Sequence, residues 1–167
     1  MPVTAPHALS APIADYTATV RELRDRAEIT DALYRFALGQ DLGDRELFAS
    51  SFTEDAELDF QPAADRWGGK APLMVGRDFI VDTILSGFAG RVDTSHQVTN
   101  PRVVIDGDTA WLTAMVEAQH LRTYNHDVFA LLKNRYEVEL VRDGERWLMR
   151  SVRIVNIWFT GDPKAIF

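Results

Sequence analysis

The sequence predicts an α+β fold in which three helices pack on one face of a curved, mostly antiparallel β-sheet. Helical periodicity dominates before Gly90, and long runs of β-branched and aromatic residues dominate after it. Those runs contain two Asp-Gly pairs, Asp106-Gly107 and Asp143-Gly144, which are typical of tight hairpin turns. Helices and strands are therefore segregated along the chain, as they are in α+β proteins.

The helices are expected in the first half of the chain. In the first of them Ile29 and Leu33 fall on one side, and Gly43 ends it because glycine is favoured just past a helix C-terminus. Asp44 is a suitable N-cap for the second helix. The expected helices are residues 17–40, 44–52 and 77–88.

The strands follow from alternation and turn residues. Residues 53–60, TEDAELDF, alternate apolar and acidic side chains and predict the first strand. Residues 61–76 are rich in Pro, Gly and Ala, and we expect a loop that forms a lid or rim. Two long hairpins follow, one about each Asp-Gly turn. Asn100-Pro101 interrupts the first of these strands and should bend or bulge it.

The length of the chain suits one domain. With 167 residues, 46% of them apolar, it can bury a sizeable core or enclose a cavity. We expect this domain over residues 17–167. The preceding residues, 1–16, contain several prolines and small side chains and should form a flexible arm.

Charge and composition exclude several functional classes. With 25 acidic and 18 basic residues the formal charge is −7, which argues against nucleic acid or an anionic membrane as a partner. The chain has no cysteine, so thiolate chemistry and Cys-ligated metals are excluded. The N-terminus resembles no signal peptide and no apolar run suits a membrane span, so we favour the cytoplasm. Glycine spacing matches no nucleotide-binding motif, and no cofactor is expected.

Strand parity places polar side chains on the face that should line the interior. In the strand over residues 110–124 the inward positions are mostly small or aliphatic but include His120. His96 shares the parity of Val98, beside the expected bend. On the last two strands the same reasoning turns further polar and aromatic residues inward, and we expect them to bind substrate. These are Asn134, Tyr136, Asn156 and Trp158.

The first helix adds a carboxylate to this interior. Asp41 lies four residues after Ala37 and eight after Leu33, so it continues the buried stripe, and Tyr34 precedes it by two turns on the same side. A carboxylate at a helix C-terminus is disfavoured by about 0.3 to 1 kcal/mol. An imidazole would compensate this cost, because a buried Asp can hold one ring nitrogen and leave the other free as a base. We therefore predict that Asp41 orients a histidine.

Each of these signals alone has an ordinary structural interpretation. An inward histidine is more often a hydrogen-bonded core residue, and an aspartate after a helix is more often a cap or turn residue. Together they favour a functional site, since every buried polar atom without a partner costs about 1 to 3 kcal/mol. Asp41, His96 and His120 would also suit a metal site with two histidines and one carboxylate, although no metal-binding motif spaces them.

Three segments carry a resemblance to a known family. They are YRFALGQDLGDRELFASSFTEDAELDF, TSHQVTNPRVVIDGDTAWLTAMVEAQHLR and RDGERWLMRSVRIVNIWF. From about residue 17 to 160 the chain resembles SnoaL-like members of the nuclear transport factor 2-like superfamily. Scytalone dehydratase, bile-acid dehydratase, hexachlorocyclohexane dehydrochlorinase, ketosteroid isomerase and polyketide cyclases share that fold. The resemblance implies a cone-shaped barrel with an internal pocket.

The resemblance also implies roles for individual residues. The family's dyad aspartate falls on Asp41, its catalytic strand histidine falls on His96, and the second histidine of scytalone dehydratase falls on His120. Gln40 stands where scytalone dehydratase has a tyrosine, a role that Tyr34 or Tyr136 could take over. Where the dehydrochlorinase has an arginine in the last strand this chain has Val152, which makes chloride abstraction unexpected. Asn156 falls on a further polar pocket position of that family.

These observations predict a cofactor-independent lyase of the dehydratase type, acting on an apolar cyclic or polyketide-like substrate. An isomerase or cyclase with the same proton shuttle is one alternative. A non-catalytic module for small-molecule binding or assembly, like the β-subunits of ring-hydroxylating dioxygenases, is another.

Apolar residues with the parity of the outer sheet face predict a homo-oligomer, a dimer or trimer. These residues are Trp111, Met115, Phe129 and Leu131.

Overall fold

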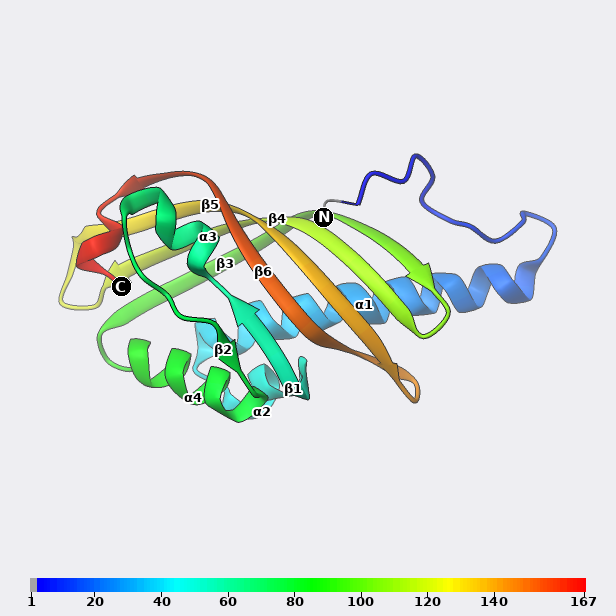
Figure 1. Cartoon of the computed structure of the whole chain (residues 1–167), viewed down its shortest axis with the longest axis horizontal. Coiled ribbons are helices and arrows are strands. Elements are labelled where there is room, and N and C mark those ends of the chain that lie inside the picture. Colours follow the sequence, from blue (N-terminus) through cyan, green and yellow to red (C-terminus); the bar gives the residue numbers. More distant parts are fainter. Residues whose placement is uncertain (1–2) are drawn as a thin grey trace.

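The computed structural model describes residues 3–167 and arranges them as helices against one six-stranded sheet (Figure 1). The helices are α1 (Tyr16–Leu42), α2 (Arg45–Ala49), α3 (Gln61–Ala64) and α4 (Arg77–Phe88), with the 3-10 helices η1 (Asp65–Trp67) and η2 (Pro163–Ala165). The strands are β1 (Phe52–Asp59), β2 (Met74–Val75), β3 (Val92–Asp106), β4 (Thr109–Arg122), β5 (Asn125–Asp143) and β6 (Arg146–Gly161).

The sheet has the order β2-β1-β6-β5-β4-β3. The pair β1 and β6 is parallel, and every other pair is antiparallel. The two Asp-Gly turns connect β3 to β4 and β5 to β6 as predicted, and Gly107 and Gly144 have φ of 59° and 60°, which favours glycine. A further hairpin joins β4 to β5, so the last four strands form a continuous meander. The predicted α+β fold is confirmed.

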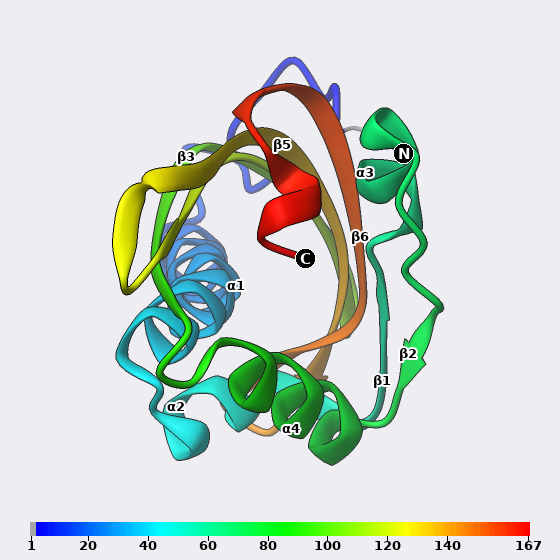
Figure 2. The same ribbon diagram turned by 90° about the vertical axis from the view of Figure 1, so that its left-hand side faces the viewer.

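The sheet curves because its strands carry bulges. In β3 the register shifts between Thr99 and Arg102, and Asn100 has a φ of 53°, so the predicted bend at Asn100-Pro101 is confirmed. In β6 the register shifts twice, which leaves Arg150 and Ile157 without partners on β5. Figure 2 shows the resulting half barrel, with α1 and α4 along its open side and the C-terminal segment in front of the opening.

The helix α1 fits the concave side of this sheet. The Asp15 side chain accepts the Ala18 N–H at its start, and Gly43, with a φ of 65°, ends it in the left-handed conformation. Gly39 allows close packing, because a Cβ there would lie 2.6 Å from the Phe48 Cα of α2. The side of α1 that faces the sheet is buried and includes Ile29, Ala32, Leu33, Phe36 and Ala37.

One element prediction was wrong. Residues 61–76 were expected to be a loop, but they contain α3, η1 and the short strand β2. Pro62 suits the first turn of α3, where its missing N–H costs no helical hydrogen bond. Met74 and Val75 pair with β1. The segment is therefore an ordered wall rather than a bare loop.

Residues 3–15 form the described part of the predicted arm, and residues 1 and 2 lie outside the described residues. The Val3 N–H donates to the Thr113 hydroxyl on β4 at 2.9 Å, and the Ala11 N–H donates to the Glu22 carboxylate of α1 at 2.8 Å. Tyr16, assigned to the arm, begins α1 instead. None of the helices in the described residues is long and apolar enough to cross a membrane.

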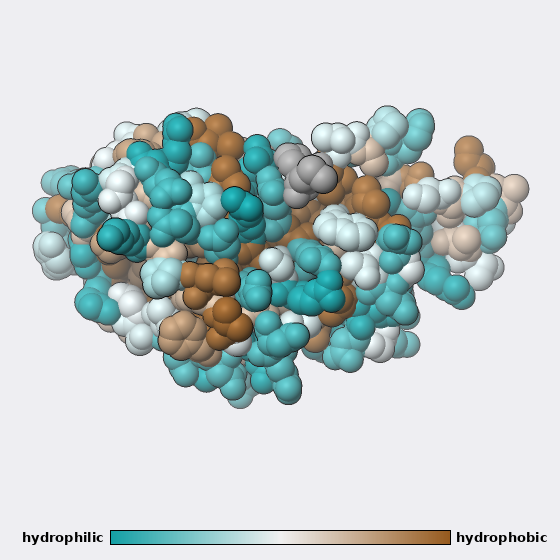
Figure 3. Space-filling model, viewed as in Figure 1, coloured by the Kyte–Doolittle hydropathy of each residue, from teal (hydrophilic) through white to brown (hydrophobic). Residues whose placement is uncertain are grey.

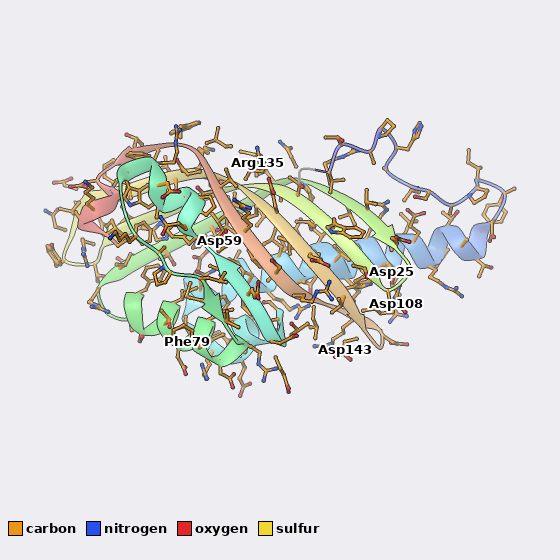
Figure 4. All side chains as sticks on the ribbon, in the orientation of Figure 1. Asp25, Asp59, Phe79, Asp108, Arg135 and Asp143 are labelled. Atoms are coloured by element: carbon orange, nitrogen blue, oxygen red, sulfur yellow. The ribbon has the colours of Figure 1, made fainter. Side chains whose placement is uncertain are left out.

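A partly buried charge network joins α1 to the β5–β6 hairpin. The Asp25 carboxylate accepts two hydrogen bonds from the Arg142 guanidinium, at 2.7 and 2.8 Å, and one from the Trp147 indole at 3.1 Å. These donors hold the pKa of Asp25 below its usual range, the Arg142 hydrogen bonds most of all. In Figure 4, Asp25 and Asp108 lie toward the end of the sheet opposite Phe79 on α4. The network fastens the end of the barrel away from α4.

We predict that Asp25→Asn lowers the free energy of unfolding by about 2 to 3 kcal/mol, because Arg142 and Trp147 lose a charged acceptor that is itself buried. Asp108→Asn is the matched control, since Asp108 also pairs with Arg142 but its side chain is 83% exposed. It should cost less than about 1 kcal/mol. Urea unfolding of both variants gives the two values, and equal losses would contradict the assignment.

Candidate active site

Asp41 and His96 form a hydrogen-bonded pair where the last turn of α1 meets the first part of β3. The His96 Nδ1 lies 2.6 Å from Asp41 Oδ1, and the His96 backbone N–H donates to Oδ2 at 2.7 Å. The Thr94 hydroxyl donates to Oδ1 at 2.8 Å. The His96 side chain is 4% exposed and that of Asp41 is 18% exposed. The structure brings together the two residues that the sequence analysis paired.

These donors determine the charge of the carboxylate. Burial by itself raises the pKa of Asp41, but the hydrogen bond and charge of His96, its backbone N–H and the Thr94 hydroxyl together hold that pKa below its usual value. An ionised Asp41 requires a proton on His96 Nδ1 for their hydrogen bond. The other ring nitrogen, Nε2, is then left as an acceptor, and His96 lines the cavity described below. The geometry suits a general base.

His120 lies on β4 beside His96, and the two ring centroids are 5.4 Å apart at an interplanar angle of 88°. The residue is 4% exposed, and its Nδ1 is buried without a hydrogen-bond partner among the described residues. Burial, and next the charge of His96, lower the pKa of His120 to about 3. His120 is therefore a neutral imidazole at ordinary pH.

Three more of the predicted residues are buried. Asn134 and Tyr136 on β5 line the cavity, and Asn156 on β6 donates from its side-chain amide to the Asn134 side-chain oxygen at 2.9 Å. The arrangement fixes the Asn134 amide plane and leaves its own N–H groups available. Burial, and next the charge of Asp41, raise the pKa of Tyr136, so its hydroxyl keeps its proton.

The site opens into a cavity of about 820 Å³. Aromatic and aliphatic side chains from α1, the strands and α4 form most of its wall, so substrate bound there would be largely shielded from water. Residues 67–74, which belong to the expected lid or rim, also line it, and so do residues 164, 166 and 167. The apolar wall includes Phe36, Leu58, Trp67, Phe88, Leu132, Ile154 and Phe167.

Two predicted site residues lie elsewhere. Tyr34 is 46% exposed and does not line the cavity, and Leu38, one turn further along α1, is also exposed. Trp158 is 47% exposed, and the cause is the bulge at Ile157. A single unpaired residue reverses strand parity, so Asn156 points inward and Trp158 does not.

Sequence reasoning missed the aromatic residues at the open end of the cavity. The Phe167 ring lies 4.9 Å from the His120 ring and stacks on Trp67 at 5.9 Å, and Phe88 lies 5.4 Å from His120. Phe88 ends a helix and could have been suspected from its apolar character. Nothing in the local sequence of Phe167 indicates that the chain folds back over the barrel.

The alternative of a metal site finds no support in the positions of side chains. Among the described residues, no three or more His, Asp or Glu side chains are grouped in a way that could hold a metal ion. Asp41 directs its carboxylate to His96 and Thr94 instead.

The sequence over residues 21–153 matches the SnoaL-like domain family. Because the match extends over most of the chain, the protein belongs to this family of nuclear transport factor 2-like α+β proteins, as the resemblance implied.

One protein of similar sequence and two solved structures illustrate what this chain is similar to. The chain is 33% identical over 147 residues to the terrestric acid biosynthesis cluster protein E of Penicillium crustosum, covering 84% of this chain and 88% of that protein. A crystal structure from Novosphingobium aromaticivorans described as a scytalone dehydratase matches with a TM-score of 0.72 at 20% identity, over 86% and 91% of the two chains. Hexachlorocyclohexane dehydrochlorinase of Novosphingobium barchaimii matches with a TM-score of 0.72 at 20% identity, over 89% and 97%. The two structures show the same fold.

We predict that acid destabilises the protein partly through His120. The pKa of His120 falls from its ordinary 6.5 to about 3 on folding, so the unfolded chain binds more protons between these values and stability is lost as pH falls below about 6.5. His120→Asn removes this titration. Urea unfolding at pH 4.5 and 7.5 should therefore show a smaller pH dependence for the variant than for the wild type, whereas an identical dependence would contradict a neutral buried imidazole.

Proposed function

We propose that the protein is a cofactor-independent lyase of the dehydratase type that acts on an apolar cyclic or polyketide-like substrate. The observation that carries this proposal is the 2.6 Å contact between Asp41 and His96 at the wall of a largely apolar cavity of about 820 Å³. A fixed carboxylate–imidazole pair in a shielded site is suited to removing a proton from carbon.

In the proposed reaction His96 Nε2 accepts a proton from a carbon next to a substrate carbonyl. Asp41 is ionised, so it stabilises the imidazolium that forms and holds the ring in one orientation. The electron pair of the broken C–H bond forms the new C=C bond as the C–O bond to the hydroxyl breaks. The proton on His96 then leaves with the hydroxyl as water, which restores the neutral imidazole.

The other polar residues that line the cavity would stabilise negative charge on the carbonyl oxygen. A neutral His120 can donate a hydrogen bond from a ring nitrogen without first becoming charged, and Asn134, fixed by Asn156, can donate from its amide. Tyr136 keeps its hydroxyl proton and offers a third donor. Preorganised donors of this kind contribute about two to three powers of ten in rate each.

The comparisons support this class of chemistry. The relative from Penicillium crustosum belongs to a biosynthetic cluster for terrestric acid, and the structural matches include proteins described as a dehydratase and a dehydrochlorinase. An elimination that begins with proton removal fits the descriptions of the two structural matches. An isomerase or cyclase would use the same dyad and differ in where the proton returns, so the product distinguishes them.

We predict that Asp41→Asn and His96→Ala each reduce kcat/KM by about 10² to 10⁴, because each removes the oriented base. Cyclic β-hydroxycarbonyl compounds are the substrates to test, with products followed by mass spectrometry. Loss of water marks a dehydratase, whereas unchanged mass with deuterium taken up from D2O marks an isomerase.

Asp31→Asn is the control for this experiment. Asp31 lies on the same helix, and its side chain is 54% exposed and paired with Arg35, away from the cavity. It should retain wild-type activity. Full turnover by Asp41→Asn and His96→Ala would remove the proposed mechanism.

A further inference from the structure

The cavity is lined by four basic side chains, in a chain whose formal charge is −7. The described residues that line it include no Asp or Glu. Three of the four are exposed and one is half-buried, so they lie at the mouth, whereas His120, Asn134 and Tyr136 are buried deeper. We call them the mouth cations: Lys70, Arg91, Arg122 and Lys164.

Three of the mouth cations are brought together from distant parts of the chain. Arg91 precedes β3, and its backbone carbonyl accepts the N–H of Thr123 at 3.1 Å. Thr123 directly follows Arg122, the last residue of β4. The Arg122 guanidinium donates to the Ala165 carbonyl at 2.8 Å, next to Lys164 in η2. The fold therefore concentrates like charges where β3 begins, β4 ends and η2 packs.

These cations lack carboxylate partners within the protein. None of the four forms an ion pair with an Asp or Glu of the described residues. Two acids nearby in the sequence direct their carboxylates to other groups: Asp93 lies 2.8 Å from the His126 Nε2, and Asp162 accepts the Lys164 backbone N–H at 3.1 Å. Gathering unpaired like charges is unfavourable. An anionic group of a ligand would relieve it.

The mouth cations lie close enough to the proposed base and hydrogen-bond donors for one substrate molecule to contact both. His120 and Arg122 lie on the same side of β4, two residues apart, which is about 7 Å along a strand. The Phe88 and Phe167 rings contact the His120 ring, and both line the same cavity as Arg122, where they form an aromatic wall. An apolar ring could thus rest against this wall with its reacting carbon near the histidines and a charged group at the mouth.

We propose that the substrate is an organic acid whose apolar body fills the cavity and whose carboxylate is held by the mouth cations. This inference rests on the proposed function, because it names the substrate of that same site. A carboxylate suits the mouth better than a phosphate. Arg91 already donates to the Ser86 carbonyl at 2.7 Å and Arg122 to the Ala165 carbonyl at 2.8 Å, so part of their hydrogen-bonding capacity is used. The C-terminal end of α4, at Gly87 and Phe88, lines the same region, and its partial negative charge opposes a doubly charged group more than a singly charged one.

The experiment compares two ligands of matched shape, 2-naphthoate and its neutral amide 2-naphthamide, by isothermal titration calorimetry at low salt. Wild-type protein should bind the acid about tenfold more tightly, which is the effect of one or two half-exposed ion pairs. The preference should shrink as salt is added, because exposed charges are screened. Equal affinities, including no measurable binding of either compound, would overturn the proposal.

Two double variants and a control assign the preference to the mouth. In Arg91→Gln/Lys164→Gln and in Lys70→Gln/Lys164→Gln the acid should lose most of its advantage over the amide. Arg146→Gln is the matched control, because Arg146 is exposed at the start of β6 and does not line the cavity. It should keep the wild-type preference. An unchanged preference in both double variants would place the anion elsewhere and overturn the proposal.

A third ligand separates carboxylate from phosphate. Tighter binding of 2-naphthyl phosphate than of 2-naphthoate would overturn the carboxylate assignment, and weaker binding would support it. The measurement needs no turnover, so it can be repeated with Asp41→Asn. A carboxylate preference that persists in an inactive protein separates failure of the proposed mechanism from failure of this inference.

Discussion

The arrangement of the site depends on the hydrogen bonds that the Asp41 carboxylate accepts from β3. A negative charge in the last turn of a helix is disfavoured by about 0.3 to 1 kcal/mol, and its partial burial adds to that cost. The Thr94 hydroxyl, the His96 N–H and the His96 imidazole compensate both. They can do so only if the end of α1 is held against the first residues of β3. The position of α1 against the curved sheet therefore also determines the orientation of the His96 imidazole.

The cavity also requires a curved sheet. A flat sheet could pack directly against α1 and would leave no space between them. The bulges at Asn100 in β3 and at Arg150 and Ile157 in β6 supply that curvature. Each bulge also changes which side chains face inward. Asn156 stands just before one of these reversals, which is why it can reach Asn134 across the pair of strands.

The sequence predicts those elements and side-chain orientations that depend on interactions between residues near one another in the chain. Helix α1, the two Asp-Gly hairpins and the inward parity of His120, Asn134 and Tyr136 follow from periodicity and turn chemistry, as does the pairing of Asp41 with a histidine. Features that depend on tertiary structure do not follow. Tyr34 has the spacing of a buried residue, but its side chain is largely exposed on the folded helix. Trp158 has the parity of a pocket residue, but an unpaired Ile157 reverses it.

The cavity combines a dry interior with a charged mouth, and the two properties limit each other. The burial that keeps His120 neutral would also oppose a bare carboxylate beside it, since an unpaired buried charge costs several kcal/mol. A substrate that carries an acid group would therefore bind with that group among the mouth cations and its apolar body inward. That orientation would present the same end of the molecule to His96 in every encounter. The mouth cations and the neutral His120 deep in the cavity would then together determine which carbon of the substrate reacts.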